Sequence, residues 1–380
     1  MTNTGPNDSD TNRRDFLKGV AIAAGGLALA GRAGTAFAST IPASSPQQPS
    51  APNWAGQIGL ELWTVRDLTA RDYVGTLEKV ARIGYKEIEP ANGYANMTPK
   101  QFRALLDRLG LKMPSTHSGV TVGSDAEMQK QLAGFQVMGI QYSSLAEPRP
   151  AGRGNGAPSR AISAGTSGGR ASRGAATTPP ASPAAERQAT QQFIRNMVQA
   201  RAAEDVKHEA ARYNRIGELA RKFGIKLLIH NHTAEFVPCK DSPDVPYTIL
   251  LNETDPELVV FQLDIGWAVV AGQNPVELFQ KSPGRFVLWH VKDVACVKCL
   301  PALPDQGARM AEARLVPVGN GEIDYGDIFK HADVAGMKHF VVEQDSAADW
   351  GDSVAAARVS YEHLHATLAA APNDSPRPSK

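Results

Sequence analysis

Short apolar runs and longer helical patterns alternate eight times along the chain, and this alternation restricts the fold more than any other feature. The apolar runs lie at residues 58–64, 85–90, 111–117, 139–145, 225–232, 258–264, 285–293 and 338–345. Helical patterns separate and follow them, at 71–83, 98–109, 125–138, about 187–223, 245–252, 275–281, 324–334 and 352–370. Strands this apolar have no solvent-exposed face, which indicates a parallel sheet covered by helices. Eight such units, closed on themselves, predict an α/β protein with a (β/α)8 TIM barrel.

The barrel is expected to form a single domain over residues 57–370. Residues 147–186 interrupt it after the fourth strand with Gly, Ala, Ser and Pro and almost no large apolar side chains. Such a segment cannot bury enough surface to offset the entropy of ordering, so we interpret it as a low-complexity, disordered insertion at the active-site rim. Residues 39–56 have the composition of a linker, and residues 371–380 are predicted to be a disordered tail.

Residues 1–38 have the pattern of an export signal. NRRDFLK at 12–18 is followed by the mildly apolar run GVAIAAGGLALAG and by AFAS at 36–39. This order resembles a twin-arginine signal, which predicts cleavage after Ala38 and a periplasmic protein. An uncleaved membrane anchor is the alternative, but the apolar run is shorter than the about 20 residues that span a bilayer, so no stable anchor is expected.

Charge and cysteine content exclude several classes of function. The net charge of +1 provides neither a basic field for nucleic acid nor an acidic excess for cationic partners, so a small-molecule substrate is expected. Three cysteines are too few for a disulfide framework or a four-thiolate zinc site. Cys296 and Cys299 could close a small loop in an oxidising compartment. The sequence leaves homo-oligomerisation open.

Polar side chains gather at the predicted carboxyl ends of the strands, where barrels of this type carry active sites. The fifth strand ends in IHNH, and His230 and His232 project from one face of it because strand side chains alternate. A single strand histidine is more often a hydrogen-bonded core or rim residue than a ligand, so this pair gains weight only from its neighbours. The other strand ends supply Glu87, Glu89, His117, Asp264, His290, Lys292, Glu343 and Asp345.

Carboxylates and imidazoles that converge from separate strands repel one another and lose solvation, unless a cation or bound protons compensate them. Mixed nitrogen and oxygen ligands of this kind suit divalent metal ions such as Mn, Zn, Co or Mg. The strand ends therefore predict a metal site.

Several motifs resemble the sugar phosphate isomerase/epimerase family, also described as xylose isomerase-like TIM barrels. They are LELWTVRD at 60–67, GYKEIEP at 84–90, FQLDIGWAVVAGQNP at 261–275, LWHVKD at 288–293, VGNGEIDYGDIF at 318–329 and FVVEQD at 340–345. The resemblance implies one divalent metal, with ligands that carry over onto Asp264, His290 and Glu343. On the fifth strand the family often has Glu-Asn-His, and here His230 stands at the position of the usual carboxylate as the fourth ligand.

The resemblance implies a metal-dependent isomerase or epimerase that acts on an unphosphorylated sugar, keto-sugar or cyclitol through a metal-stabilised enediolate. Loss of the fifth-strand carboxylate puts simple epimerisation in doubt. A lyase, either inosose dehydratase-like or eliminating a group from a keto-glycoside, is the first alternative, and a non-catalytic sugar-binding module is the second. An apurinic endonuclease shares this barrel but needs more metal ligands and a basic DNA face.

The remaining site residues receive roles within this hypothesis. The catalytic candidates are Glu343 as the base and Glu89, His232 and Lys292 as groups that relay or donate protons. The candidates for substrate binding are His117, for a hydroxyl, and Trp63 and Trp267, for a sugar face, with core filling an equal alternative for the two tryptophans. Three questions stay open at this point: whether His230 or His232, the latter with Glu235, is the fifth-strand ligand, which metal binds, and which sugar reacts.

Overall fold

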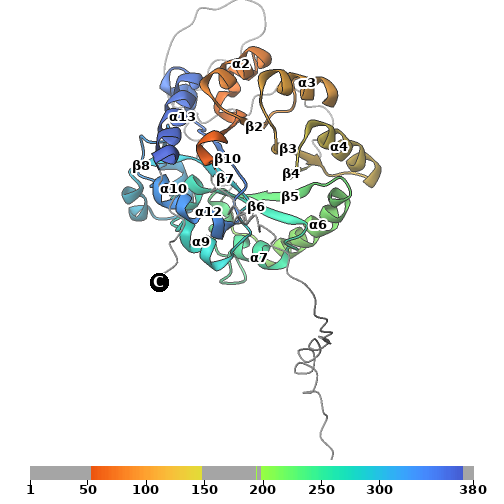
Figure 1. The fold of residues 1–380 in the computed structure, drawn as a ribbon. Helices are drawn as coiled ribbons and strands as arrows, with labels where there is room; N and C mark the ends of the chain where they lie inside the picture. Colours follow the sequence, from red (N-terminus) through yellow and green to blue (C-terminus); the bar gives the residue numbers. More distant parts are fainter. Residues whose placement is uncertain (1–52, 148–193, 195–197, 371–380) are drawn as a thin grey trace, which may run out of the picture. The chain divides into compact units, whose positions relative to one another are not determined.

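Eight parallel strands form one sheet that curls into a nearly closed barrel in the computed structural model, which describes residues 53–147, 194 and 198–370 (Figure 1). In sheet order the strands are β2 (Glu87–Glu89), β1 (Gly59–Glu61), β10 (His339–Val342), β7 (Leu288–Val291), β6 (Val259–Asp264), β5 (Lys226–His230), β4 (Tyr142–Ala146) and β3 (Ser115–Thr121). The ring closes where the backbone N–H of Ile88 donates to the carbonyl of Lys112, and that of Lys112 to Lys86, both at 2.9 Å. Each predicted apolar run overlaps one of these strands, so the predicted TIM barrel is confirmed.

Helices cover the outside of the barrel (Figure 1). They are α1 (Arg66–Thr69), α2 (Tyr73–Ile83), α3 (Pro99–Leu109), α4 (Asp125–Met138), α6 (Ala203–Arg221), α7 (Pro246–Glu253), α8 (Ile265–Val270), α9 (Pro275–Lys281), α10 (Gln306–Glu312), α11 (Tyr325–Ile328), α12 (Ala332–Ala335) and α13 (Ser353–Ala370). The helices α3 and α4 begin at capping boxes of Thr98 and Ser124 and end at left-handed Gly110 and Gly139. These start and stop signals explain why the sequence located both helices so closely.

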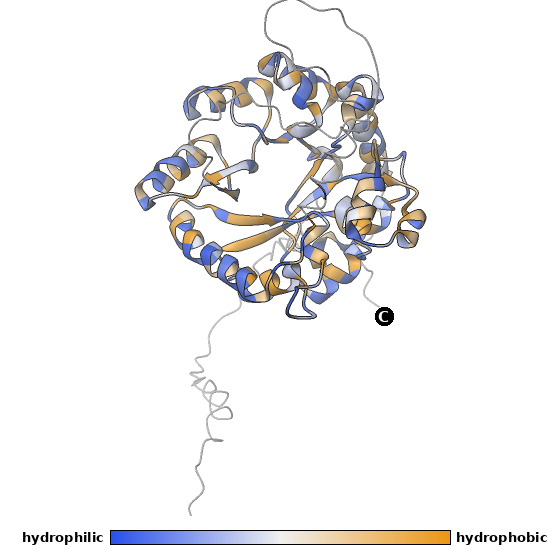
Figure 2. Cartoon of the chain, turned by 180° about the vertical axis from the view of Figure 1, so that it is seen from behind, coloured by the Kyte–Doolittle hydropathy of each residue, from blue (hydrophilic) through white to orange (hydrophobic). Residues whose placement is uncertain are grey.

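The core lies between the strands and the helices, where Trp289 stacks on Phe279 with ring centres 4.9 Å apart. Apolar residues run along the strands, whereas the helices carry both apolar and polar positions (Figure 2). Each large apolar side chain that is fully buried in this layer contributes about 1.5–3 kcal/mol. The barrel wall is therefore a rigid support for the residues at its rim.

Inside the barrel the side chains change from apolar to polar toward the carboxyl ends of the strands. Leu228, Val260 and Leu288 form a small buried cluster in β5, β6 and β7. Two residues further along the same strands stand His230, Gln262 and His290, which face the same way because strand side chains alternate. The polar side chains at the carboxyl ends of these strands thus lie directly above a buried apolar layer.

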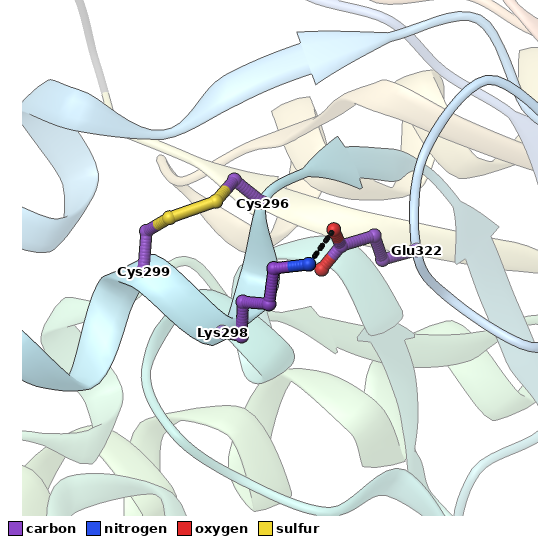
Figure 3. The surroundings of a disulfide bond; sticks show 4 residues. All are labelled: Cys296, Lys298, Cys299 and Glu322. Carbon is purple, nitrogen blue, oxygen red and sulfur yellow. Dashed lines mark ion pairs between the residues drawn. A yellow bond between two sulfur atoms is a disulfide. The ribbon is translucent and has the colours of Figure 1, made fainter.

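An excursion after β7, not predicted from the sequence, carries a two-stranded antiparallel ribbon of β8 (Asp293–Ala295) and β9 (Arg314–Val316). Between these strands lie a 3-10 helix (Val297–Ala302) and α10. A disulfide joins Cys296 to Cys299 at the start of that 3-10 helix, next to an ion pair of 3.5 Å between Lys298 and Glu322 (Figure 3). The small loop expected from CVKC is therefore closed.

Asp293 connects the two ends of this excursion by hydrogen bonds. Its carboxylate accepts hydrogen bonds from the backbone N–H groups of Gly319, Gly321 and Ile323 at 2.9–3.2 Å, and from that of Val294 at 2.9 Å. A Cβ at position 321 would collide with the Asp293 carboxylate, so only glycine fits there. The loop that contains Gly319 and Gly321 is thus held against β8.

Three predicted segments lie mainly or wholly outside the described residues. These are the export signal with most of the linker, the insertion from residue 148 onward, and the tail at 371–380. In the part of the chain that the structure describes, no helix is both long and apolar enough to cross a membrane.

Candidate metal and active site

The carboxyl ends of four strands bring together the four residues predicted as metal ligands. Asp264, His290 and Glu343 offer ligand atoms that all lie within 4.8 Å of one another, and His230, His290 and His117 form a second such group. Oδ2 of Asp264 lies 3.8 Å from Nδ1 of His290 and 4.0 Å from Nε2 of His230. Both groups share His290, so one small region holds all five side chains.

Glu89 holds two of the imidazoles in place. Its Oε1 lies 2.6 Å from Nδ1 of His117 and 2.9 Å from Nε2 of His290. Its Oε2 accepts hydrogen bonds from Gln262, at 2.7 Å, and from the Ser115 hydroxyl. Burial alone would raise the pKa of Glu89, but His117 and then His290 hold that pKa well below its usual range. These four contacts favour an orienting role for Glu89 over that of a free base.

His290 lies between two carboxylates, since Nδ1 is 2.6 Å from Oε2 of Glu343 while Nε2 faces Glu89. Burial would lower the pKa of His290, but Glu343 and then Glu89 raise it well above its ordinary value. The ring is therefore an imidazolium in this arrangement. A histidine that binds a metal ion must be neutral, so binding of an ion at His290 would release a proton.

His230 differs from His290, because its surroundings lower the pKa of the ring rather than raise it. Burial first, and then the neighbouring rings of His117 and His290, hold the pKa of His230 well below its usual range. Its Nδ1 is buried and has no hydrogen-bond partner among the described residues. A neutral imidazole has a free lone pair, which is the state that binds a metal ion.

Lys292 places an ammonium group among three carboxylates. Its Nζ lies 3.0 Å from Oδ2 of Asp264, 3.1 Å from Oε2 of Glu343 and 2.7 Å from Oδ2 of Asp345. Burial would lower the pKa of Lys292, but Asp264 and then Asp345 and Glu343 raise it well above its ordinary value. The side chain is only 1% exposed, so this permanent charge offsets part of the acidic excess of the site.

The donor atoms present fit one divalent ion. Oδ2 of Asp264 is buried and has no hydrogen-bond partner in the described part of the chain, although the ammonium of Lys292 is near. Two imidazoles and two carboxylates form a mixed nitrogen and oxygen set, which suits Zn, Mn or Co. The residues that would hold the ion are His230, Asp264, His290 and Glu343.

Comparison with known proteins names this architecture. Residues 181–364 match the family model described as a xylose isomerase-like TIM barrel. The chain folds as a TIM barrel, and its residues 181–364 are similar to the xylose isomerase-like family. Among solved structures, it resembles a sugar phosphate isomerase/epimerase from Parabacteroides distasonis, with a TM-score of 0.56 and 20% identity over 86% of this chain and 98% of that one. It also resembles a xylose isomerase-like protein from Mycobacterium smegmatis in complex with magnesium, with a TM-score of 0.53 and 16% identity over 84% and 99%. At these identities the likeness concerns the fold alone.

The curated relatives of this chain include inosose dehydratases. One from Clostridium perfringens (strain 13) is 32% identical over 152 residues, which cover 38% of this chain and 49% of the relative. One from Clostridium botulinum (strain Alaska E43) is 36% identical over 122 residues, or 31% and 39%. The chain thus spans about half the length, or less, of the curated relatives it matches.

The other residues predicted for the site lie around the cluster. The His117 ring faces that of His230 at 4.6 Å, and its side chain is 25% exposed, so it can meet a substrate. The His232 ring lies 4.9 Å from the His230 ring, and its backbone N–H donates to Oε2 of Glu235 at 2.7 Å. Glu235 therefore stabilises the turn after β5.

The two tryptophans, predicted to pack against a sugar face or to fill the core, have different surroundings. Trp267 is 6% exposed and packs with the apolar side chains of the excursion, which favours the core-filling alternative. Trp63 is half-buried, and the guanidinium of Arg66 stacks over its ring at 4.5 Å.

Sequence reasoning missed several polar residues of this barrel and misplaced one. Ser115 and Gln262 bind Glu89, and Glu61 is a buried carboxyl at the end of β1. The alternation of side chains could have found Gln262, two residues before Asp264. Glu87, expected at the same rim, instead pairs at 2.9 Å with His339, the first residue of β10, and so lies at the opposite end of the barrel.

Proposed function

We propose that this barrel is a divalent-metal-dependent lyase that acts on an unphosphorylated keto-sugar or keto-cyclitol. It would remove a proton beside the carbonyl carbon and expel the β-hydroxyl as water. The observation that carries this proposal is the buried cluster of His230, Asp264, His290 and Glu343 in a chain whose curated relatives are inosose dehydratases. The strand-five imidazole, where the related family often has a carboxylate, supports elimination over simple epimerisation.

When bound, a divalent ion supplies Lewis acidity toward the carbonyl oxygen. The chain's own residues then have separate tasks. Oε2 of Glu343 is engaged by His290 and Lys292, which leaves Oε1 to accept the α proton. Burial would raise the pKa of Glu343, but Lys292 and then His290 hold it well below its usual range, so this group is ionised at neutral pH.

The departing hydroxyl must receive a proton, because hydroxide is a poor leaving group. Lys292 is protonated but only 1% exposed, so it stabilises negative charge near Glu343 more readily than it reaches a substrate. His232 is half-buried beside His230, and burial lowers its pKa, so the neutral ring would relay to the departing hydroxyl the proton that Glu343 takes from the α carbon. His117 and Glu89 form a fixed pair on the β2 and β3 side, where His117 can bind a substrate hydroxyl.

The test separates the reaction classes with one substrate set. The protein, stripped of metal and then loaded with Mn, Co or Zn, is incubated in deuterated water with inosose and with an unphosphorylated keto-hexose. A lyase gives exchange at the α carbon and a product lighter by one water, measured by NMR and mass spectrometry. An isomerase or epimerase gives a product that has lost no water and differs in mass only by the deuterium it has exchanged, and binding without exchange indicates a sugar-binding module. Either of these results would refute the proposal.

A further inference from the structure

Glu61 stands between two carboxylates of the site although nothing so far assigns it a task. It is the last residue of β1, and its Cα pairs in register with that of Glu89 on β2. On the other side, Leu60 pairs with Val342 of β10, which puts Glu61 level with Glu343. Parallel strands in this register present their side chains at one height. Glu61 therefore belongs to the same layer as the proposed metal ligands.

The two carboxyl oxygens of Glu61 differ in their contacts. Oε2 accepts a hydrogen bond from the backbone N–H of Trp63 at 2.7 Å, which starts the 3-10 turn Leu62–Val65. Oε1 is buried and has no partner among the residues that the structure describes, and the whole residue is 1% exposed. A buried polar atom without a partner is costly, and most buried polar groups in proteins are paired. The turn alone would need only one acceptor.

The surroundings of Glu61 also disfavour a purely structural role. Burial first, and then the carboxylates of Glu343 and Glu89, raise the pKa of Glu61 well above its ordinary value, although His290 opposes this. A glutamine could cap the same turn without adding an acidic group to this layer. The carboxyl group is therefore kept against a cost in stability, which is typical of residues that act on a ligand.

We propose that Oε1 of Glu61 binds a hydroxyl group of the polyhydroxylated substrate, which makes Glu61 a substrate-binding residue of the site. This inference rests on the proposed function, since it takes the ligand to be a keto-sugar or keto-cyclitol. A hydroxyl group both donates and accepts, so it satisfies a carboxyl oxygen in either protonation state. Glu61 would then select substrates that carry a hydroxyl at the position facing β1.

The test uses two variants of the full chain and one matched control. Glu61→Gln keeps an acceptor for the Trp63 N–H, and Glu61→Met removes all polar atoms. The control is Glu87→Gln, a buried carboxylate of the neighbouring strand that pairs with His339 at the far end of the barrel. Binding of inosose and of its monodeoxy analogues is measured by calorimetry on metal-loaded protein, and melting temperature is measured without substrate.

The inference predicts that Glu61→Met weakens inosose binding at least tenfold, but leaves unchanged the affinity for one monodeoxy analogue. Glu61→Gln should melt no lower than the parent, whereas Glu87→Gln should melt lower and bind inosose normally. Equal inosose affinity in the parent and Glu61→Met, or a fall in the melting temperature of Glu61→Gln as large as that of the control, would show a structural role and overturn the inference. A parent protein that binds no inosose would instead contradict the proposed function on which it rests.

Discussion

Replacement of Lys292 by methionine tests the electrostatic balance of the site directly. The substitution keeps the length and apolar character of the stem but removes the ammonium group that lies within 3.1 Å of three carboxylate oxygens. Loss of one partner from a buried ion pair costs about 3–5 kcal/mol, because the remaining charge stays buried and uncompensated. In a chain of this size each kcal/mol lowers the melting temperature by about 2 °C, so a fall of about 6–10 °C is expected.

The assay is thermal unfolding followed by circular dichroism, first in chelator and then with added Mn or Zn. The variant has one more net negative charge beside Asp264 and Glu343, so it should gain more stability from the metal than the parent does. A ligand at 100 times its Kd stabilises by about 2.7 kcal/mol, which would restore a large part of the loss. Lys226→Met is the control, because the partner of Lys226, Glu257, lies 3.6 Å away and is 79% exposed.

An exposed pair of that kind is worth less than about 1 kcal/mol. A loss in Lys292→Met that is no larger than the loss in the control would refute the electrostatic reasoning. Equal metal stabilisation of parent and variant would show that the ion does not bind near Lys292.

Three further predictions concern the metal ligand on β5 and the parts outside the described residues. His230→Ala should lose metal measured by elemental analysis after dialysis, while His232→Ala should keep its metal and lose turnover; the reverse pattern would move the ligand to His232. Replacement of Arg13 and Arg14 by lysine should abolish periplasmic accumulation of a form that begins at Ser39, and unchanged export would contradict the twin-arginine route. Deletion of residues 147–186 with a short Gly/Ser join should leave the melting temperature nearly unchanged, because loop-closure entropy varies slowly with length; a large fall would show that the segment packs onto the barrel.

The fold could be predicted from the sequence because strand and helix periodicity, and the caps of helices such as α3 and α4, act over short distances. The excursion after β7 was missed because β8 and β9 have only three residues each, too few for a periodic pattern. The position of His290 followed from its motif, but its two carboxylate neighbours come from distant strands. Only the closed barrel brings them together, so the protonated state of the ring could not be predicted.

Errors about single side chains have a similar cause. Glu61 lies inside an apolar run, and its register with Glu89 and Glu343 depends on strand order rather than on local sequence. The sequence left a sugar face and the core as equal alternatives for Trp267, and the unpredicted excursion, whose apolar side chains pack against it, favours the core. A carboxylate or a tryptophan near a strand end can point to either environment until the neighbouring strands are known.

Because the Asp293 carboxylate holds the loop of Gly319 and Gly321 against β8, the segment of the excursion between them could be exchanged. One carboxylate binds both ends of this excursion, at Val294 and at the turn of Gly319 and Gly321. Residues between Cys296 and Ala313 could therefore be lengthened, shortened or replaced by the corresponding segment of a related barrel, while His290 keeps its position. For an engineer who wishes to alter the substrate range of this scaffold, that segment offers a place to begin, as long as the apolar side chains that pack on Trp267 are kept.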